Sequence, residues 1–271
     1  MSACIEIAEE LAMDKFSGSI QITRKFLRKV KEIDIDKSEL HRCFDILIDS
    51  HTDMAALKNA YRVLERVPDE GISTAIAELL RSLERAPKKI SAHFAKLLPD
   101  NAIVMTYSQS GTVGEAFIEA QRMGKLSGVI LSEGRPDLEG RKFAEFFALK
   151  KIPVTITIDI ALGQFVDSVD AVAIGADAVT PEYIVNKIGT NQLAMLANRA
   201  NKPIYALAST HKFAQYATNR KIVQPESIWE NPPKDVDIQS PLFEKIPLAQ
   251  LTAIICEKGL MSMSEIERML K

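Results

Sequence analysis

The polar residues that could do chemistry lie in one stretch, which begins at Asp177 and continues nine residues later with Asn186 and Lys187. The apolar, β-branched run 169–174 just before Asp177 is typical of a buried parallel strand. Residues 192–200, after the stretch, are rich in Ala and Leu with helical spacing. The pattern places an acid at the carboxyl end of a strand, facing a lysine at a helix N-terminus. Open α/β sheets bind anionic ligands at such points, so this stretch is a candidate site.

Each of these residues has a chemical role and a structural alternative. Asp177 could act as a general acid or base, because burial raises the pKa of a carboxyl group, or it could cap or orient a loop. Lys187 could meet a phosphate as a point charge, with the amides of Gly189 and Thr190 adding hydrogen bonds at the helix N-terminus. The alternative is a capping Asn186 beside a solvated lysine. Spacing alone leaves these alternatives open.

A second basic candidate is Arg135, which follows the apolar run 127–132 and precedes a helix-sized segment. An arginine at the carboxyl end of a strand suits recognition of phosphate or carboxylate. The alternative is a surface ion pair with Glu133 or Asp137.

The elements that position these residues divide the chain into two parts. Residues 1–98 show helical spacing of apolar residues throughout, which predicts an N-terminal α-helical subdomain. Residues 99–271 predict a Rossmann-like α/β domain, because short apolar runs alternate with helix-sized segments, as in βαβ units. Two C-terminal helices, near 248–258 and at 263–270, are expected to close this domain. The apolar runs that predict the parallel sheet are 102–106, 127–132, 153–158, 169–174 and 203–208.

Bulk composition excludes several classes of protein. The formal charge is −2, from 34 basic and 36 acidic residues, so no global field favours nucleic acid or an anionic membrane. No apolar run approaches the roughly 18 residues of a membrane span, and acidic residues near the N-terminus argue against a signal peptide. Cys4, Cys43 and Cys256 are scattered without metal-ligand spacing and are predicted to be buried free thiols. We expect a cytoplasmic protein without a metal or a cofactor.

The stretch from Gly175 to Gln192 resembles a superfamily signature, and so do segments 133–140, 153–159 and 209–213. That superfamily contains the alpha, beta and delta subunits of translation initiation factor 2B and two aldose–ketose isomerases. The isomerases act on methylthioribose 1-phosphate and on ribose 1,5-bisphosphate. The resemblance, closest over residues 100–215, implies a catalytic aspartate at Asp177 and an Asn186–Lys187 pair that holds the sugar or its phosphate. It also implies dimerisation through the Rossmann-like domain.

The chain departs from the isomerase pattern at positions that bear on proton transfer. Ser108 stands where the isomerases carry a cysteine that works with the aspartate, and Tyr107 stands where they carry a histidine. A thiol with a pKa of about 8.5 can exchange protons near neutrality, whereas a serine hydroxyl needs a neighbouring base. The phosphate-holding Arg-Gly-Ala element of the isomerases corresponds to segment 17–19, which lacks the arginine. Pro181 also stiffens the loop between Asp177 and Asn186.

We therefore predict a regulatory relative of the alpha subunit, which binds a sugar phosphate or a nucleoside monophosphate in a degenerate pocket. Its expected protein partners are a second copy of the chain and, by resemblance, initiation factor 2. The alternative is an aldose–ketose isomerase of a ribose 1-phosphate derivative, such as ribose 1,5-bisphosphate or methylthioribose 1-phosphate. In that enzyme Asp177 is the acid/base, Lys187 and Arg135 hold phosphate, and Ser108 has a changed role. A structural subunit with an empty pocket is the third hypothesis.

Overall fold

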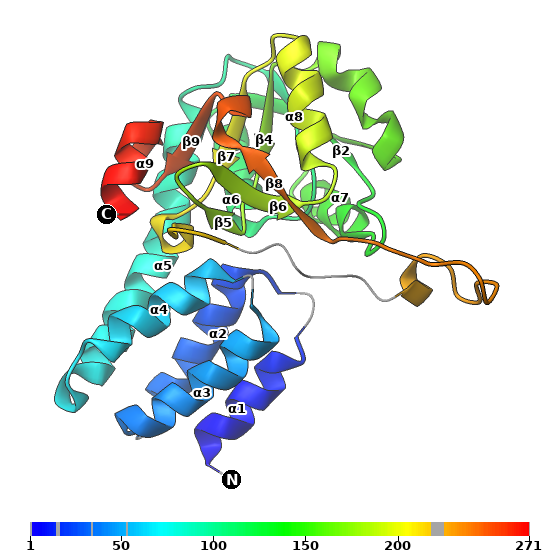
Figure 1. The fold of residues 1–271 in the computed structure, drawn as a ribbon. Coiled ribbons are helices and arrows are strands. Elements are labelled where there is room, and N and C mark those ends of the chain that lie inside the picture. The colour runs from blue at the N-terminus through cyan, green and yellow to red at the C-terminus, as the bar shows by residue number, and fades with distance from the viewer. Residues whose placement is uncertain (1, 15–16, 34, 53, 218–224, 271) are drawn as a thin grey trace.

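The computed structural model describes residues 2–14, 17–33, 35–52, 54–217 and 225–270. A bundle of α-helices forms the N-terminal part, and a layered α/β domain forms the rest, as the sequence predicts (Figure 1). The bundle helices are α1 (Ala3–Ala12), α2 (Ser19–Lys31), α3 (Lys37–Ser50), α4 (Ala55–Glu65) and α5 (Ile72–Ala95), with a short 3-10 turn, η1 (Asp69–Gly71), before α5.

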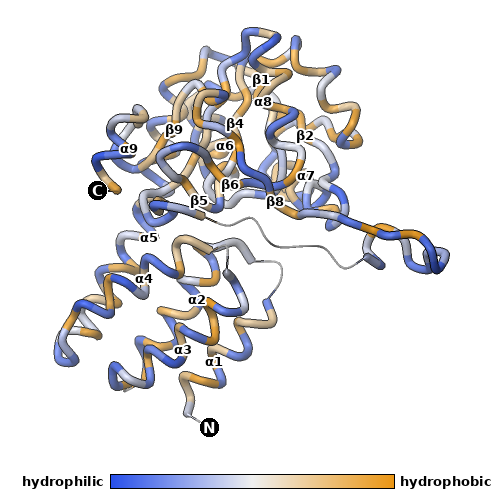
Figure 2. Tube along the Cα trace, viewed as in Figure 1, coloured by the Kyte–Doolittle hydropathy of each residue, from blue (hydrophilic) through white to orange (hydrophobic). Residues whose placement is uncertain are grey.

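The bundle forms because each of its helices is apolar on one side only. Hydrophobic and hydrophilic residues alternate along these helices in Figure 2, as an amphipathic pattern requires. In α2 the fully buried side chains Ile22, Phe26 and Val30 recur every four residues. Phe26 packs edge-to-face on Phe44 of α3, with ring centroids 4.9 Å apart. These contacts give the bundle a core separate from that of the sheet.

The cysteines correct one expectation. Cys4 of α1 and Cys43 of α3 form a disulfide between two buried side chains, with Cα atoms 6.2 Å apart. That separation is within the usual range for a disulfide. The prediction of free thiols is therefore wrong for this pair, and it holds for Cys256, which is buried and unpaired.

Helix α5 joins the two parts of the molecule. Its first turns contribute to the bundle core, whereas Ile90, Phe94 and Ala95 near its end pack into the core beneath the sheet. Asn59 of α4 makes a second link, because its Nδ2 donates to the carbonyls of His211 and Phe213 at 2.8 and 2.7 Å. A boundary between residues 98 and 99 therefore stays a prediction.

A seven-stranded sheet lies at the centre of the α/β domain, in the order β10-β9-β7-β4-β1-β2-β3. The neighbours from β9 to β3 run parallel, and β10 runs antiparallel to β9. All five predicted strands are present and parallel. The strands are β1 (Ala102–Met105), β2 (Leu126–Ser132), β3 (Val154–Thr157), β4 (Ala171–Ile174), β7 (Ile204–Leu207), β9 (Ala253–Cys256) and β10 (Gly259–Met261).

Helices cover both faces of this sheet, which explains the continuous apolar runs of its strands. In β4, Ala171 and Ala173 face a core shared with α5 and the two connecting helices α6 (Gly111–Arg122) and α7 (Glu139–Leu149). Val172 and Ile174 face the opposite core, shared with α8 (Thr190–Arg199), α9 (Met263–Leu270) and a 3-10 segment, η2 (Asp159–Ser168). Every strand residue of β4 is therefore buried. Across the described ranges, none of the helices is both long and apolar enough to cross a membrane.

The strand order reverses beside β1. From β1 the chain moves outward through β2 to β3, and it then returns to β4 on the other side of β1 before continuing to β7 and β9. Such a switch point opens a crevice at the carboxyl ends of the two central strands, here β1 and β4. The loops there touch: a Cβ on Gly175, just after β4, would lie 2.7 Å from Ser110 Oγ, just after β1.

Two predicted elements differ from the structure. The helix expected near 248–258 is wrong, because this segment forms a 3-10 turn, η5 (Leu248–Gln250), followed by strands β9 and β10. A short apolar run fits a buried strand as well as a helix, and the open edge of β7 decides between them. The helix predicted at 263–270 is confirmed as α9. Residues 178–187, expected to be a loop and helix start, form the hairpin β5 (Ala178–Val179) and β6 (Tyr183–Lys187), which pairs with β8 (Phe243–Pro247).

Candidate functional site

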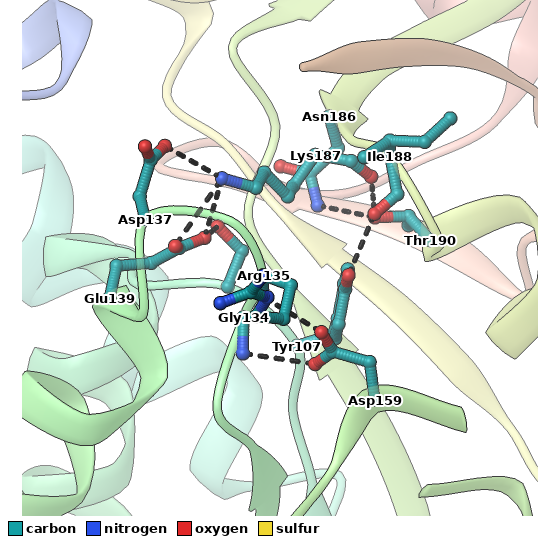
Figure 3. Close-up of polar contacts among 11 residues, drawn as sticks. Tyr107, Gly134, Arg135, Asp137, Glu139, Asp159, Asn186, Lys187, Ile188 and Thr190 are labelled. Carbon is teal, nitrogen blue, oxygen red and sulfur yellow. Dashed lines mark hydrogen bonds and ion pairs between the residues drawn. The ribbon is translucent and has the colours of Figure 1, made fainter. Parts of the chain in front are cut away.

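Lys187 lies at the end of strand β6 and not at a helix start, because the segment before it pairs as a hairpin. Its side chain is 4% exposed, and its Nζ lies 3.0 Å from Asp137 Oδ2 and 3.1 Å from Glu139 Oε1 (Figure 3). Both carboxylates belong to the loop and first turn that follow β2. A buried lysine needs such partners to stay charged. The solvated lysine of the structural alternative is therefore excluded.

Ser108, which follows β1, contacts the Glu139 carboxylate. Its backbone has a positive φ of 63°, and its Oγ donates to Glu139 Oε1 at 3.1 Å. Burial raises the pKa of Glu139, and the ion pair with Lys187 and the hydrogen bond from Ser108 oppose that rise. Ser108, Glu139 and Lys187 thus form one connected polar group at the carboxyl end of the sheet.

Tyr107 holds the start of α8 in place. Its hydroxyl donates to the carbonyl of Ile188 at 2.7 Å, and its ring lies against Gly189. Gly189 has a φ of +99°, and a Cβ there would lie 2.7 Å from the Tyr107 hydroxyl, so only glycine fits. The pKa of Tyr107 is raised by burial and by the nearby carboxylates of Asp159, Glu139 and Glu244. This phenol therefore stays protonated across the physiological range.

Asn186 and Thr190 make a short internal network. Asn186 Nδ2 donates to Thr190 Oγ1 at 3.0 Å, and Thr190 Oγ1 donates to the Lys187 carbonyl at 2.6 Å. Both side chains are buried. At the adjacent helix N-terminus, the amide of Asn191 donates to Glu244 Oε1 at 2.8 Å. A protein carboxylate thus occupies the amide that follows those of Gly189 and Thr190, which the sequence analysis assigns to an anionic ligand.

Arg135 lies at the same edge of the sheet, and its side chain is exposed. Asp159 positions its loop, because the amides of Gly134 and Arg135 donate to the two Asp159 carboxylate oxygens at 2.9 and 2.7 Å (Figure 3). The Arg135–Pro136 peptide bond is cis. The expected alternative partners are engaged elsewhere, since Glu133 pairs with Arg141 and Asp137 pairs with Lys187.

Asp177 is half-buried and lies in a different set of contacts. Its amide donates to the Val185 carbonyl at 2.7 Å, which fixes it beside β6. Lys212, buried after β7, donates to the carbonyl of Ala176 at 2.5 Å. Burial lowers the pKa of Lys212, and the charge of Asp177 opposes that shift. Asp177 therefore lies near enough to the buried Lys212 side chain to interact with it electrostatically.

The structure thus brings Ser108, Lys187, Asn186, Gly189 and Thr190 to one edge of the sheet, with Arg135 on its surface. The sequence patterns predict Asp137 only as an ion-pair partner of Arg135. They predict no role for Glu139, Asp159 and Lys212, or for Tyr107 as a hydrogen-bond donor. The acidic residues stand in or beside segments 133–140 and 153–159, which carry the superfamily resemblance, so their position after strands was a usable signal. Among the residues that the structure describes, no group of three His, Cys, Asp or Glu side chains is placed to hold a metal ion.

Residues 3–263 match the Initiation factor 2 subunit family. A translation initiation factor eIF-2B subunit 2-like protein of Pyrococcus furiosus is 30% identical over 267 residues, covering 94% of this chain and 95% of the relative. A ribose 1,5-bisphosphate isomerase of Archaeoglobus fulgidus is 27% identical over 281 residues, covering 96% and 90%.

The fold agrees with these relatives. The crystal structure of translation initiation factor eIF-2B from Pyrococcus horikoshii OT3 superposes with a TM-score of 0.84 at 24% identity, over the whole of both chains. The chain is also similar in fold to a chain of the tetrameric eIF2B-beta2-delta2 complex from C. thermophilum, with a TM-score of 0.77 at 18% identity. The fold is also similar to that of 5-methylthioribose 1-phosphate isomerase from Pyrococcus horikoshii OT3, with a TM-score of 0.75 at 20% identity. The chain belongs to the Initiation factor 2 subunit family, and its relatives include proteins named ribose 1,5-bisphosphate isomerase at 27% identity.

Proposed function

We propose that this chain is a regulatory protein of the initiation factor 2B alpha type, acting in the cytoplasm. It binds a sugar phosphate or a nucleoside monophosphate at the carboxyl edge of the sheet without isomerising it. The contact of Ser108 carries this proposal, because its hydroxyl donates to Glu139, a carboxylate that is itself held by Lys187. A serine hydroxyl does not ionise near neutral pH as a cysteine thiol does. Tyr107, at the position before it, is a phenol held in its protonated form.

Three features support ligand binding at this edge. The site lies at the switch point between β1 and β4, where open α/β sheets bind their ligands. Lys187 supplies a buried cation, and Arg135 supplies an exposed one on the same side. Helix α8 begins beside them with Gly189 and Thr190. Together they provide positive charge and hydrogen-bond donors for a phosphorylated ligand.

The alternative function is an aldose–ketose isomerase, and the surroundings of Asp177 favour it. Asp177 is half-buried and interacts electrostatically with Lys212, whose pKa burial lowers. Acid–base groups in such desolvated pairs are common in active sites. Ribose 1,5-bisphosphate isomerases are also among the relatives, at 27% identity. In this alternative Asp177 transfers the proton, Lys187 and Arg135 hold phosphate, and Ser108 has a changed role.

A ligand screen separates these functions. We expect one of four probe classes (ribose 1,5-bisphosphate, methylthioribose 1-phosphate, ribose 5-phosphate or nucleoside monophosphates) to raise the melting temperature. At 100 times its dissociation constant, the ligand should stabilise the fold by about 2.7 kcal/mol. NMR of each stabilised sample should show no ketose product. Lys187→Met should abolish the shift, whereas the exposed control Lys150→Ala should retain it.

The other outcomes identify the other functions. Ketose formation by the wild type that disappears in Asp177→Asn would establish the isomerase and contradict our proposal. Absence of both stabilisation and product with every probe would favour a structural subunit with an empty pocket.

Two protein partners belong to the proposal: a second copy of the chain and initiation factor 2. Initiation factor 2 is implied only by the family and by the names of its members. If the proposal holds, adding purified initiation factor 2 should shift the chain to an earlier position in gel filtration. The second copy has a structural argument as well, which concerns the open edge of the sheet.

The exposed edge of β3 is expected to form a homodimer contact. Ile156, Ile158 and Ile160 are 43%, 55% and 85% exposed there, beside a strand with one unpaired edge. Light scattering after gel filtration should give twice the chain mass of 30.1 kDa. Ile160→Glu should shift the protein to the monomer mass, and Met13→Glu, at a 75% exposed site in the bundle, should not. A wild-type mass of one chain would contradict this contact.

A further inference from the structure

The Lys187 ammonium group already donates hydrogen bonds to two carboxylates, those of Asp137 and Glu139, in the described arrangement. An ammonium group has three donors. Lys187 Nζ lies 3.0 Å from Asp137 Oδ2, and 3.1 and 3.3 Å from the two oxygens of Glu139 (Figure 3). The side chain is 4% exposed, so the ammonium group cannot turn outward to meet a ligand. A phosphate that uses Lys187 must therefore displace a carboxylate or share the lysine with it.

The two carboxylates differ in how easily they can leave. Asp137 has 41% of its side chain exposed and can turn into water. Glu139 is 17% exposed, lies in the first turn of α7 and receives the Ser108 hydrogen bond. Its carboxyl carbon also lies only 2.9 Å from the place where a Cβ on Gly134 would stand. Lys187, Ser108 and the backbone at Gly134 therefore hold Glu139 in place. A phosphate bound at Lys187 would lie close to the Glu139 carboxyl group.

The charges around Glu139 make its ionised form unfavourable beside an anion. The groups that face it are Lys187 of β6, Asp137 of its own loop, and Tyr107 and Ser108 after β1. Asp159 of η2 and Glu244 of β8 also lie near enough to raise the pKa of Tyr107, and Arg135 adds one cation at the surface. With Glu139 ionised, these residues comprise four carboxylates and two cations. The site is thus net negative before any phosphate arrives.

We propose that Glu139 controls anion binding at Lys187 by taking up a proton: phosphate or sulfate binds when Glu139 is neutral, and binding carries one proton into the site. This inference rests on the proposed function, because it concerns the same ligand site. In the neutral form the carboxyl group can donate to an anion oxygen, and Lys187 is released from one of its two partners. Ionised Glu139 instead repels the anion and keeps the lysine engaged.

The shift in the pKa of Glu139 has the direction that this proposal requires. Burial already raises the pKa of Glu139 above its usual value. An anion bound at Lys187 would raise it further, because a like charge disfavours the ionised form. By linkage, a ligand that raises the pKa of a group binds more tightly as the pH falls through that pKa. Affinity for a fixed anion should therefore fall as the pH rises.

Inorganic sulfate is the probe for the test, because its charge does not change between pH 4.5 and 8, unlike that of phosphate. For the wild type we expect the sulfate dissociation constant to rise by about tenfold per pH unit above the pKa of Glu139. Glu139→Gln should bind sulfate more tightly than the wild type at pH 8 and lose this pH dependence. Asp137→Asn, which removes the other carboxylate from the same lysine, should keep it.

A second measurement needs no variant. Calorimetry of sulfate binding to the wild type, in two buffers that differ in ionisation enthalpy, should show uptake of about one proton at those pH values where the dissociation constant rises tenfold per pH unit. Sulfate binding that is lost in Lys187→Met but independent of pH, with no proton uptake, would overturn the role of Glu139 alone. No sulfate binding by the wild type or Glu139→Gln at any pH would overturn both this inference and anion binding at Lys187.

Discussion

Replacing Lys187 by methionine is expected to lower the free energy of unfolding by about 3 kcal/mol at pH 7, the lower end of the range for breaking a buried ion pair. The substitution leaves Glu139 and Asp137 facing each other without a cation. We expect a loss at the lower end of this range because the Asp137 side chain is 41% exposed and remains hydrated. Urea unfolding followed by circular dichroism measures the loss.

The control for this prediction removes the charge that the lysine compensates. Glu139→Gln alone should be neutral or stabilising at pH 7, because burial outweighs Lys187 in setting its raised pKa. The double variant Lys187→Met/Glu139→Gln should recover part of the lost stability, which gives a coupling energy for the pair. If Lys187→Met lowered the free energy of unfolding by the same amount in the wild type and in Glu139→Gln, loss of the ion pair would not be the cause.

The contribution of Glu139 to the free energy of unfolding should decrease as the pH rises. A raised pKa means that folded Glu139 holds its proton at a higher pH than the unfolded chain does. Its contribution to stability is therefore fully present below the unfolded pKa of about 4.3 and is lost as the pH rises through the folded pKa. The deficit of Lys187→Met should shrink as the pH falls toward that window, and Glu139→Gln should flatten the profile.

Gly140→Ala is the second substitution with a large expected effect. A Cβ at this position would lie 1.8 Å from the Ser132 carbonyl oxygen, and 2.8 and 2.9 Å from the Glu133 backbone. These are main-chain atoms at the end of β2, so no side-chain rotation relieves the overlap. We expect a loss of at least about 3 kcal/mol, at or beyond the upper end of ordinary overpacking. Displacement of α7 would also move Glu139 away from Lys187.

A glycine in β2, the strand against which Gly140 of α7 packs, provides the matched control. A Cβ on Gly128 in β2 would meet its nearest neighbour, the Pro153 carbonyl oxygen, at 3.7 Å, which is ordinary contact. Gly128→Ala should therefore leave the urea midpoint nearly unchanged or raise it slightly. A Gly140→Ala protein as stable as the wild type would show that α7 can move away from β2, contrary to the described packing.

Much of the fold could be predicted because its signals are local. Runs such as 169–174 are apolar on both sides of the strand, and only a strand between two helical layers buries both sides. The bundle helices carry their burial pattern in their own spacing. Segment 248–258 lacks such a local signal, because its apolar residues suit a helix or a strand equally. Strand β9 in this segment pairs with β7, which lies about fifty residues earlier in the chain.

The candidate site was predicted in its location but not in its contacts. Asp177, Ser108 and Arg135 follow parallel strands, and the carboxyl ends of such strands meet at one edge of a sheet. The partners of Lys187 could not be predicted, because Asp137 and Glu139 lie about fifty residues earlier and belong to another loop. The hairpin that places Lys187 at a strand end also depends on β8, which lies far along the chain.

Residue types and local spacing were therefore sufficient for the fold class, for the N-terminal helices and five parallel strands of the sheet, and for the edge of the sheet that holds the polar groups. Periodicity and strand ends are properties of neighbouring residues, so they can be recognised without a structure. The electrostatic character of the site was decided only by the tertiary structure. Lys187 and Glu139 become a pair because separate segments converge in a buried place, where the surroundings determine which groups stay charged.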